Sequence, residues 1–136
     1  MTLEETNIAA LERFYRTFLA GDMQTLRSLV SDDFLLTNDF TPRVPTAGVF
    51  HGKDGLEKFF GILGEVISEV HVFQADEFIA SGSRVAAIGH ERMRVKTTGR
   101  LVDAKWVQVC RFRDGLMTHF EEYSDTAAWD LGFTPQ

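Results

Sequence analysis

The chain has 136 residues, of which 44% are hydrophobic and 25% charged, as expected for one globular domain covering residues 1–136. A formal net charge of −6 offers no attraction to polyphosphates or anionic surfaces, so neither nucleic acid nor a membrane is expected as a partner. The single Cys110 excludes an internal disulfide bond, and the acidic N-terminus and the lack of a long apolar run predict a cytoplasmic protein.

The first third of the sequence predicts helices. Apolar residues recur at spacings of three and four between Ile8 and Leu19, which is typical of a half-buried helix. A second, shorter helix is expected after it, with Asp22 as its cap and apolar residues continuing to Val30. The sequence therefore begins with two consecutive helices that each have one buried face.

A short strand, a loop and a third helix are expected next. Residues 34–37 form a short apolar run that predicts a strand. The segment from Asn38 to Gly48 contains two prolines and is interpreted as a loop. A third helix follows Gly52, and its apolar face extends to Ile67.

The second half of the sequence changes to the pattern of β-structure. Turn-forming residues separate its long runs, and Asp114-Gly115 is the strongest hairpin signal among them. The segment Asp125–Trp129 predicts a capped helical turn near the end of the chain. The expected strands are Val70–Ile79, Arg84–Lys96, Leu101–Arg113 and Leu116–Ser124. Helices followed by an antiparallel meander indicate an α+β architecture.

Alternation along these strands places polar groups on the inner face of the sheet. Glu91 lies on the otherwise apolar face of its strand, and Gln108 is the polar member of the apolar set on the next strand. In the last strand a bulge could change the register, so either Glu122 or Glu121 faces inward, and we favour Glu122. An inward acid is costly unless it is paired, solvated or protonated, so the pattern predicts a polar cavity in a curved sheet.

The order of elements and several short motifs resemble one known family. Three helices before a long meander are similar to the SnoaL-like and ketosteroid-isomerase-related proteins of the nuclear transport factor 2-like superfamily. This resemblance implies a cone-shaped, curved antiparallel sheet wrapped around three N-terminal helices, the cystatin-like fold. The motifs that carry it are Phe18-Leu19-Ala20-Gly21-Asp22, Phe50-His51-Gly52-Lys53-Asp54-Gly55-Leu56, Thr98-Gly99-Arg100, Arg113-Asp114-Gly115 and Glu122-Tyr123-Ser124-Asp125-Thr126.

The resemblance does not decide the reaction, because the superfamily contains isomerases, cyclases, hydrolases and proteins without catalysis. Its steroid isomerases use a tyrosine and two aspartates, whose positions correspond here to Phe14, Asn38 and Gln108. None of these can take the original role, so steroid isomerisation is not expected. In its epoxide hydrolases, the last-strand acid corresponds to Glu122, whereas the strand of Glu91 lacks the accompanying arginine.

Glu91 and Glu122 are therefore the candidate catalytic residues of a cofactor-free acid–base enzyme of isomerase, cyclase or hydrolase type. The expected substrate is a small, apolar, oxygenated molecule. Tyr15 is assigned to the core, and the histidines have no spacing suited to a metal, so no metal or cofactor is expected. The alternative is a non-catalytic ligand-binding or dimeric interaction module. The residues expected to bind the substrate are Phe14, Asn38, Phe60, Trp106, Gln108 and Phe120.

The outer face of the expected sheet predicts self-association. It mixes cationic and β-branched side chains, which is typical of a contact surface between copies. The resemblance also implies a homodimer, because members of the superfamily commonly associate through this face. The residues concerned are His90, Arg92, Arg94, Lys96, Val107, Val109, Arg111 and Arg113.

Overall fold

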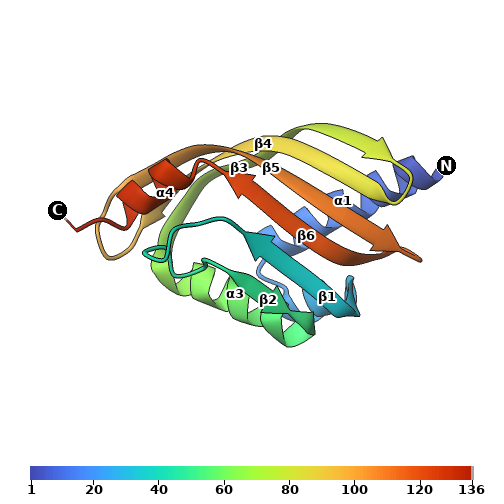
Figure 1. Ribbon diagram of the computed structural model, residues 1–136, viewed down its shortest axis with the longest axis horizontal. Coiled ribbons are helices and arrows are strands. Elements are labelled where there is room, and N and C mark those ends of the chain that lie inside the picture. The colour runs from blue at the N-terminus through green and yellow to red at the C-terminus, as the bar shows by residue number, and fades with distance from the viewer. Residues whose placement is uncertain (136) are drawn as a thin grey trace.

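Six strands form one strongly curved sheet, with helices on its concave side and at its edge (Figure 1). The computed structural model describes residues 1–135. The strands are β1 (Val30–Asn38), β2 (Val49–His51), β3 (Ile67–Ser81), β4 (Arg84–Val95), β5 (Leu101–Arg113) and β6 (Leu116–Ser124). The helices are α1 (Leu3–Leu19), α2 (Met23–Ser28), α3 (Gly52–Val66) and α4 (Thr126–Gly132).

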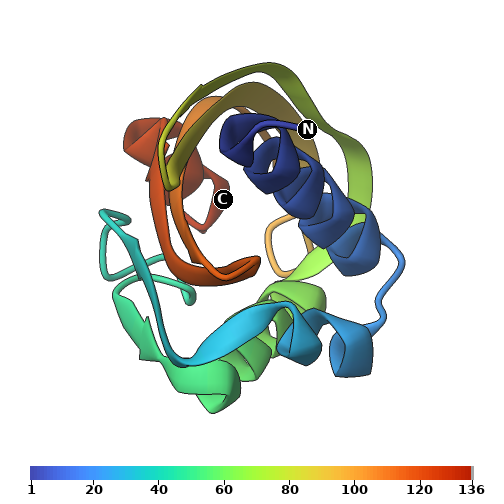
Figure 2. The ribbon, with the colours of Figure 1, turned by 90° about the vertical axis from the view of Figure 1, so that its right-hand side faces the viewer.

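The strand order is β2-β1-β6-β5-β4-β3. The meander from β3 to β6 is antiparallel, as the sequence predicted, whereas β1 runs parallel to β6. Figure 2 shows the strands curling round α1, while α3 lies beside β1. The predicted α+β cone is confirmed. Among residues 1–135, every helix is too short or too polar to serve as a membrane span.

The first helix forms where the sequence predicted it, because both its start and its buried face are well specified. Thr2 accepts a hydrogen bond from the Glu5 amide at 3.1 Å, and the Glu5 carboxylate accepts one from the Thr2 amide at 3.3 Å. This reciprocal capping satisfies two amide groups at the helix start. The stripe of Leu11, Phe14 and Tyr15 is buried against the sheet.

The second helix is shorter than predicted, and the strand after it begins earlier. α2 ends at Ser28, and Val30 already pairs with Met117 of β6. The prediction extended the helix because Val30 continues its apolar spacing. In the folded chain this β-branched residue is fully buried in the sheet. Exposed Asp33 lies within β1 and forms an ion pair with Arg113 at 2.9 Å.

Two further boundaries differ from the sequence-based prediction. The third helix ends at Val66, and Ile67 belongs to β3 rather than to the helix. The short strand β2 was not predicted, because three residues are too few to show an alternating pattern. It pairs with the end of β1 and returns the chain to α3.

A close approach of two strands makes Gly89 the most constrained glycine of the sheet. A Cβ atom at this position would overlap the carbonyl oxygen of Gln74 and the ring of Trp106. Trp106 is itself fixed by stacking on Phe73, with ring centroids 5.1 Å apart.

We therefore expect Gly89→Ala to lower the free energy of unfolding by about 2 kcal/mol in urea denaturation. Gly61→Ala, on the exposed side of α3 with open space around it, is the control and should stabilise by roughly 0.5–1 kcal/mol. Equal stability of Gly89→Ala and the unmodified chain would contradict this packing.

Candidate active site

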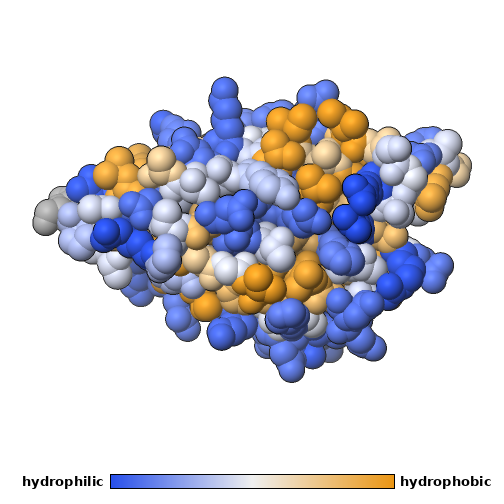
Figure 3. Space-filling model, viewed as in Figure 1, coloured by the Kyte–Doolittle hydropathy of each residue, from blue (hydrophilic) through white to orange (hydrophobic). Residues whose placement is uncertain are grey.

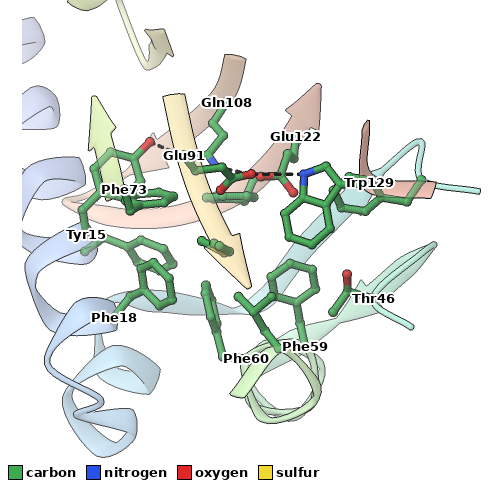
Figure 4. Close-up of a pocket in the computed structure, with 15 residues that line it drawn as sticks. Tyr15, Phe18, Thr46, Phe59, Phe60, Phe73, Glu91, Gln108, Glu122 and Trp129 are labelled. Carbon is green, nitrogen blue, oxygen red and sulfur yellow. Dashed lines mark hydrogen bonds between the residues drawn. The ribbon is translucent and has the colours of Figure 1, made fainter. Parts of the chain in front are cut away.

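A pocket on the concave side of the sheet lies where the two largest apolar clusters meet (Figure 4). Helices α1 and α3, strands β3 to β6, the loop after β1 and helix α4 all contribute to it. Its free volume is about 30 Å³, which is room for about two water molecules. Aromatic rings form most of its wall: Phe14, Tyr15, Phe18, Phe40, Phe59, Phe60, Phe73, Phe120 and Trp129.

Glu91 enters the pocket from β4 and is only 3% exposed. The indole Nε1 of Trp129 donates a hydrogen bond to its Oε1 at 3.2 Å. Burial raises the pKa of this carboxyl well above its usual range, and the neighbouring charge of Glu122 raises it further, while the bond from Trp129 opposes both effects. Burial therefore favours the protonated form of Glu91.

Glu122 enters the same pocket from β6 and is 8% exposed. Gln108 Nε2 donates a hydrogen bond to its Oε2 at 2.9 Å, which favours the ionised form. Burial outweighs this bond and raises the pKa of Glu122 to about 7. None of the ion pairs found among residues 1–135 involves Glu91 or Glu122. The two carboxyl groups thus face one pocket without a neutralising cation.

Tyr15 and Gln108 form a buried relay that ends on Glu122. The Tyr15 hydroxyl donates to Gln108 Oε1 at 2.6 Å, so both ends of the Gln108 amide are engaged. Burial is the main reason that the pKa of Tyr15 is raised, and the electrostatic influence of Cys110 and Glu122 adds to it. The phenol therefore remains a hydrogen-bond donor, and the relay fixes the orientation of the Glu122 carboxyl (Figure 4).

A bulge in the last hairpin decides which glutamate of β6 faces the pocket. The register shifts between Arg111 and Phe112 of β5, so one extra residue of β6 is accommodated there. Beyond the bulge, Gln108 pairs directly with Glu122, and the two side chains share the inner face. Glu121 lies on the outer face, 3.9 Å from Arg111. The choice that alternation left open is therefore resolved in favour of Glu122.

The pocket contains most, but not all, of the side chains expected there. Phe14, Phe60 and Phe120 line it together with Gln108 and the two glutamates. Trp106 is not a lining residue, because its ring lies behind the wall between Phe73 and Tyr15.

Asn38 is the second residue that the structure does not bring to the pocket. Its amide Nδ2 donates to the Thr46 carbonyl at 2.8 Å. Its Oδ1 accepts from the amides of Phe40 at 3.3 Å and Gly48 at 3.0 Å. Asn38 therefore holds the loop after β1 in place, and its side chain is not among the residues that line the pocket.

Several site residues were not identified from the sequence. Tyr15 was assigned to the core because the pose of α1 against the sheet does not follow from helical spacing. The sequence did place its hydroxyl on the buried stripe of the helix. Because a buried tyrosine hydroxyl usually needs a hydrogen-bond partner, this position could have indicated a polar contact. Trp129 was expected in a terminal helical turn, where Asp125 does cap α4 by accepting from Ala128 at 3.0 Å. The reach of its indole to Glu91 depends on how that helix folds back against the sheet.

The chemistry available here is proton transfer. The carboxyl groups of Glu91 and Glu122 influence each other, so they titrate as a pair rather than independently. A protonated carboxyl can donate to a ligand oxygen while an ionised one accepts a proton. Within residues 1–135, no three His, Cys, Asp or Glu side chains come together in an arrangement that could hold a metal ion.

The cone-shaped fold is that of the nuclear transport factor 2-like proteins. The chain is similar to such a protein from Burkholderia xenovorans LB400, with 26% identity and a TM-score of 0.89 over 96% of this chain and 98% of that one. It is also similar to one of unknown function from Burkholderia pseudomallei K96243, with 27% identity and a TM-score of 0.84 over 98% and 99% of the chains. TerC, which was crystallised with polyporic acid, has the same fold at 23% identity and a TM-score of 0.83 over 94% and 98%.

Sequence comparison gives the narrower assignment. The sequence model of the SnoaL-like domain family matches residues 11–120, so the chain belongs to this family. A search of curated proteins by sequence finds no match. The family resemblance read from the sequence is thereby confirmed.

Proposed function

We propose that the chain is a cofactor-free acid–base enzyme that acts on a small, mainly apolar molecule carrying an oxygen function. The observation that carries this proposal is the pair of buried carboxyl groups, Glu91 and Glu122, in one aromatic pocket without a cationic partner. A purely structural acid in a core is normally paired with arginine or lysine, because an unpaired one destabilises the fold. Perturbed carboxyl groups that converge on a pocket are typical of catalytic sites.

The two acids take different roles in this proposal. Glu122, with a pKa of about 7, is the proton-transfer group, since it can accept and release a proton near neutral pH. Glu91 retains its proton and donates a hydrogen bond to the substrate oxygen, so that it stabilises negative charge that develops there. Gln108 and Tyr15 are positioning residues, because they orient Glu122.

The pocket wall narrows the substrate class. Nine aromatic rings and few polar groups favour a hydrophobic body. Two acids without a nearby cation disfavour a carboxylate or phosphate ester. Isomerases and cyclases occur in the SnoaL-like family, and proton transfer beside a carbonyl or ring closure of an enolate would suit these groups.

A turnover screen tests the proposal. Cyclic ketones, epoxides and polyketide-like aromatic compounds are incubated with the unmodified chain and with its Glu91→Gln and Glu122→Gln variants. Turnover of one compound class that Glu122→Gln reduces strongly, and Glu91→Gln to a smaller extent, would support the assignment. Turnover that neither substitution changes would overturn it.

Ligand binding without turnover is the second candidate. It is favoured by the hydrogen bonds from Gln108 and Trp129, which hold the carboxyl groups of Glu122 and Glu91 in fixed positions. A compound that binds the unmodified chain but is recovered unchanged, with affinity insensitive to Glu122→Gln, would favour this alternative.

We also propose that the chain forms a homodimer through the outer face of the sheet. Cross-strand neighbours make a continuous apolar patch there, since Ala86 pairs with Val109 and Ile88 pairs with Val107. Figure 3 shows hydrophobic side chains gathered over the strands of this face, with hydrophilic ones around them. Such a patch with a polar rim is typical of an association surface.

Sedimentation velocity measures this association. The unmodified chain is expected at the dimer mass, and Val109→Glu is expected at the monomer mass because it places an unpaired charge in the patch. Val49→Glu is the matched control, since Val49 is exposed on β2 at the far edge of the sheet. A monomeric unmodified chain, or a dimer that Val109→Glu leaves intact, would contradict the proposed interface.

A further inference from the structure

A groove lies directly beside the pocket, on the side of the helices. It is open to solvent and has a free volume of about 280 Å³. The turn between α1 and α2, the second half of α3 and the start of β3 form its walls. Its apolar lining comes mainly from Met23, Leu26, Ile67 and Val70, and Gly21 and Gly64 leave its rim open.

The groove and the pocket share part of one wall. Phe18, Phe60 and Leu63 line both of them. The rings of Phe18 and Phe60 contact each other, with centroids 4.7 Å apart, and both side chains are only half-buried. In Figure 4 they lie on the side of the pocket away from the two carboxyl groups. Two aromatic side chains thus separate the buried acids from an open groove.

The free volumes of the pocket and the groove indicate that the shared wall limits the size of the ligand. The pocket alone, at about 30 Å³, cannot take a molecule larger than a few atoms. A phenylalanine ring turns about two side-chain bonds, and the groove gives the rings of Phe18 and Phe60 space to turn into. Their displacement would join the two spaces, without moving the backbone, into one site of ordinary ligand size.

We propose that the groove is the entrance and outer half of the binding site, and that Phe18 and Phe60 form the aromatic gate that joins it to the pocket. This inference rests on the proposed function, because it assumes that a ligand reaches Glu91 and Glu122. Neither space is lined by lysine, arginine or histidine, so no side chain would neutralise a negative charge on the ligand. The groove is also lined by Asp22, whose carboxylate accepts a hydrogen bond from the Thr25 amide at 3.1 Å as the cap of α2, so we assign the ligand no positive charge to pair with it. The ligand is an elongated, neutral molecule with its oxygen at the inner end and an apolar tail in the groove.

Two glycines of α3 provide a matched pair of variants. Gly64 lines the groove, Gly61 does not, and both are exposed with open space where a side chain would begin. Gly64→Trp fills the groove, while Gly61→Trp adds the same bulk to the same helix away from it. Neither position lies in the core, so both variants are expected to fold.

The experiment measures association of N-phenyl-1-naphthylamine, a neutral aromatic probe whose fluorescence rises in apolar surroundings, by stopped-flow with direct excitation of the probe. Gly64→Trp is expected to slow association by roughly tenfold or more, because it obstructs the route to the gate. Gly61→Trp should stay within about twofold of the unmodified chain, as surface substitutions usually do. Phe60→Ala should speed both association and release, since half of the gate is removed.

Three results would overturn the proposal. Equal slowing, or none, in the two tryptophan variants would show that the probe does not pass the groove. Binding only to Phe60→Ala would show that the rings do not open in the unmodified chain. Absence of binding to every variant would show that no joined site exists. Failure of the proposed function looks different, because the probe would then bind through the groove as expected while no compound is turned over.

Discussion

Replacing Glu122 with glutamine is expected to lower turnover by roughly 10²–10⁴-fold while leaving the fold intact. The amide has nearly the same shape as the carboxyl, and its oxygen can still accept the 2.9 Å hydrogen bond from Gln108. What it cannot do is gain and lose a proton near pH 7, which is the property that burial gives to Glu122. The loss should therefore appear in kcat as well as in kcat/KM.

Replacing Glu91 with glutamine is expected to change the pH dependence of turnover in a different way. Burial favours the protonated form of Glu91, and the proposed role of this residue is to donate a hydrogen bond, so glutamine replaces one donor with another. Glu91→Gln should therefore lower turnover less than Glu122→Gln does. Glu122, the basic group that governs the rate, remains in place in this variant. Tyr15→Phe is the control for the relay, since it removes the donor to Gln108 but no titrating group near neutral pH. Turnover unchanged in both glutamine variants would contradict the assignment of the acids.

The inner position of these acids could be predicted from the sequence because strands have a strict period of two. Each residue of β4 and β5 has one of two orientations, and the apolar neighbours of Glu91 and Gln108 decide which face is buried. The hairpin at Asp114-Gly115 then aligns β6 with β5. Its bulge changes the register by one residue, so alternation alone could not distinguish Glu122 from Glu121.

The contributions of the helices and loops could not be predicted in the same way. Helical spacing shows that Tyr15 is buried but not which strand it meets, and only the position of α1 in the cone brings its hydroxyl to Gln108. Trp129 reaches Glu91 because α4 folds back against the sheet. Asn38, which the sequence analysis assigned to the binding site, lies outside the pocket, because short-range hydrogen bonds tie its amide to its own loop.

Stability is expected to fall as the pH rises from about 4.5 to about 7, and Glu122→Gln should remove most of this fall. Burial raises the pKa of Glu122 from 4.5 to about 7, so the folded state holds a proton that the unfolded state has released in this window. Because the folded state binds more protons, its stability is greatest below pH 4.5 and declines until the folded group ionises. The rise in pKa corresponds to about 3 kcal/mol between these limits.

Urea denaturation at pH 4.5 and pH 8 measures this effect. The glutamine variant should match the unmodified chain at pH 4.5, where Glu122 is neutral in the folded state, and should exceed its stability by up to about 3 kcal/mol at pH 8. Glu121→Gln is the control, because that side chain lies on the outer face and should not alter the difference. Glu91 acts in the same direction, so some decline should remain in the Glu122 variant. If Glu122 serves the reaction, the Glu122→Gln variant should lose turnover and gain stability at pH 8. A residue that served the fold would not lower the stability of the protein at that pH.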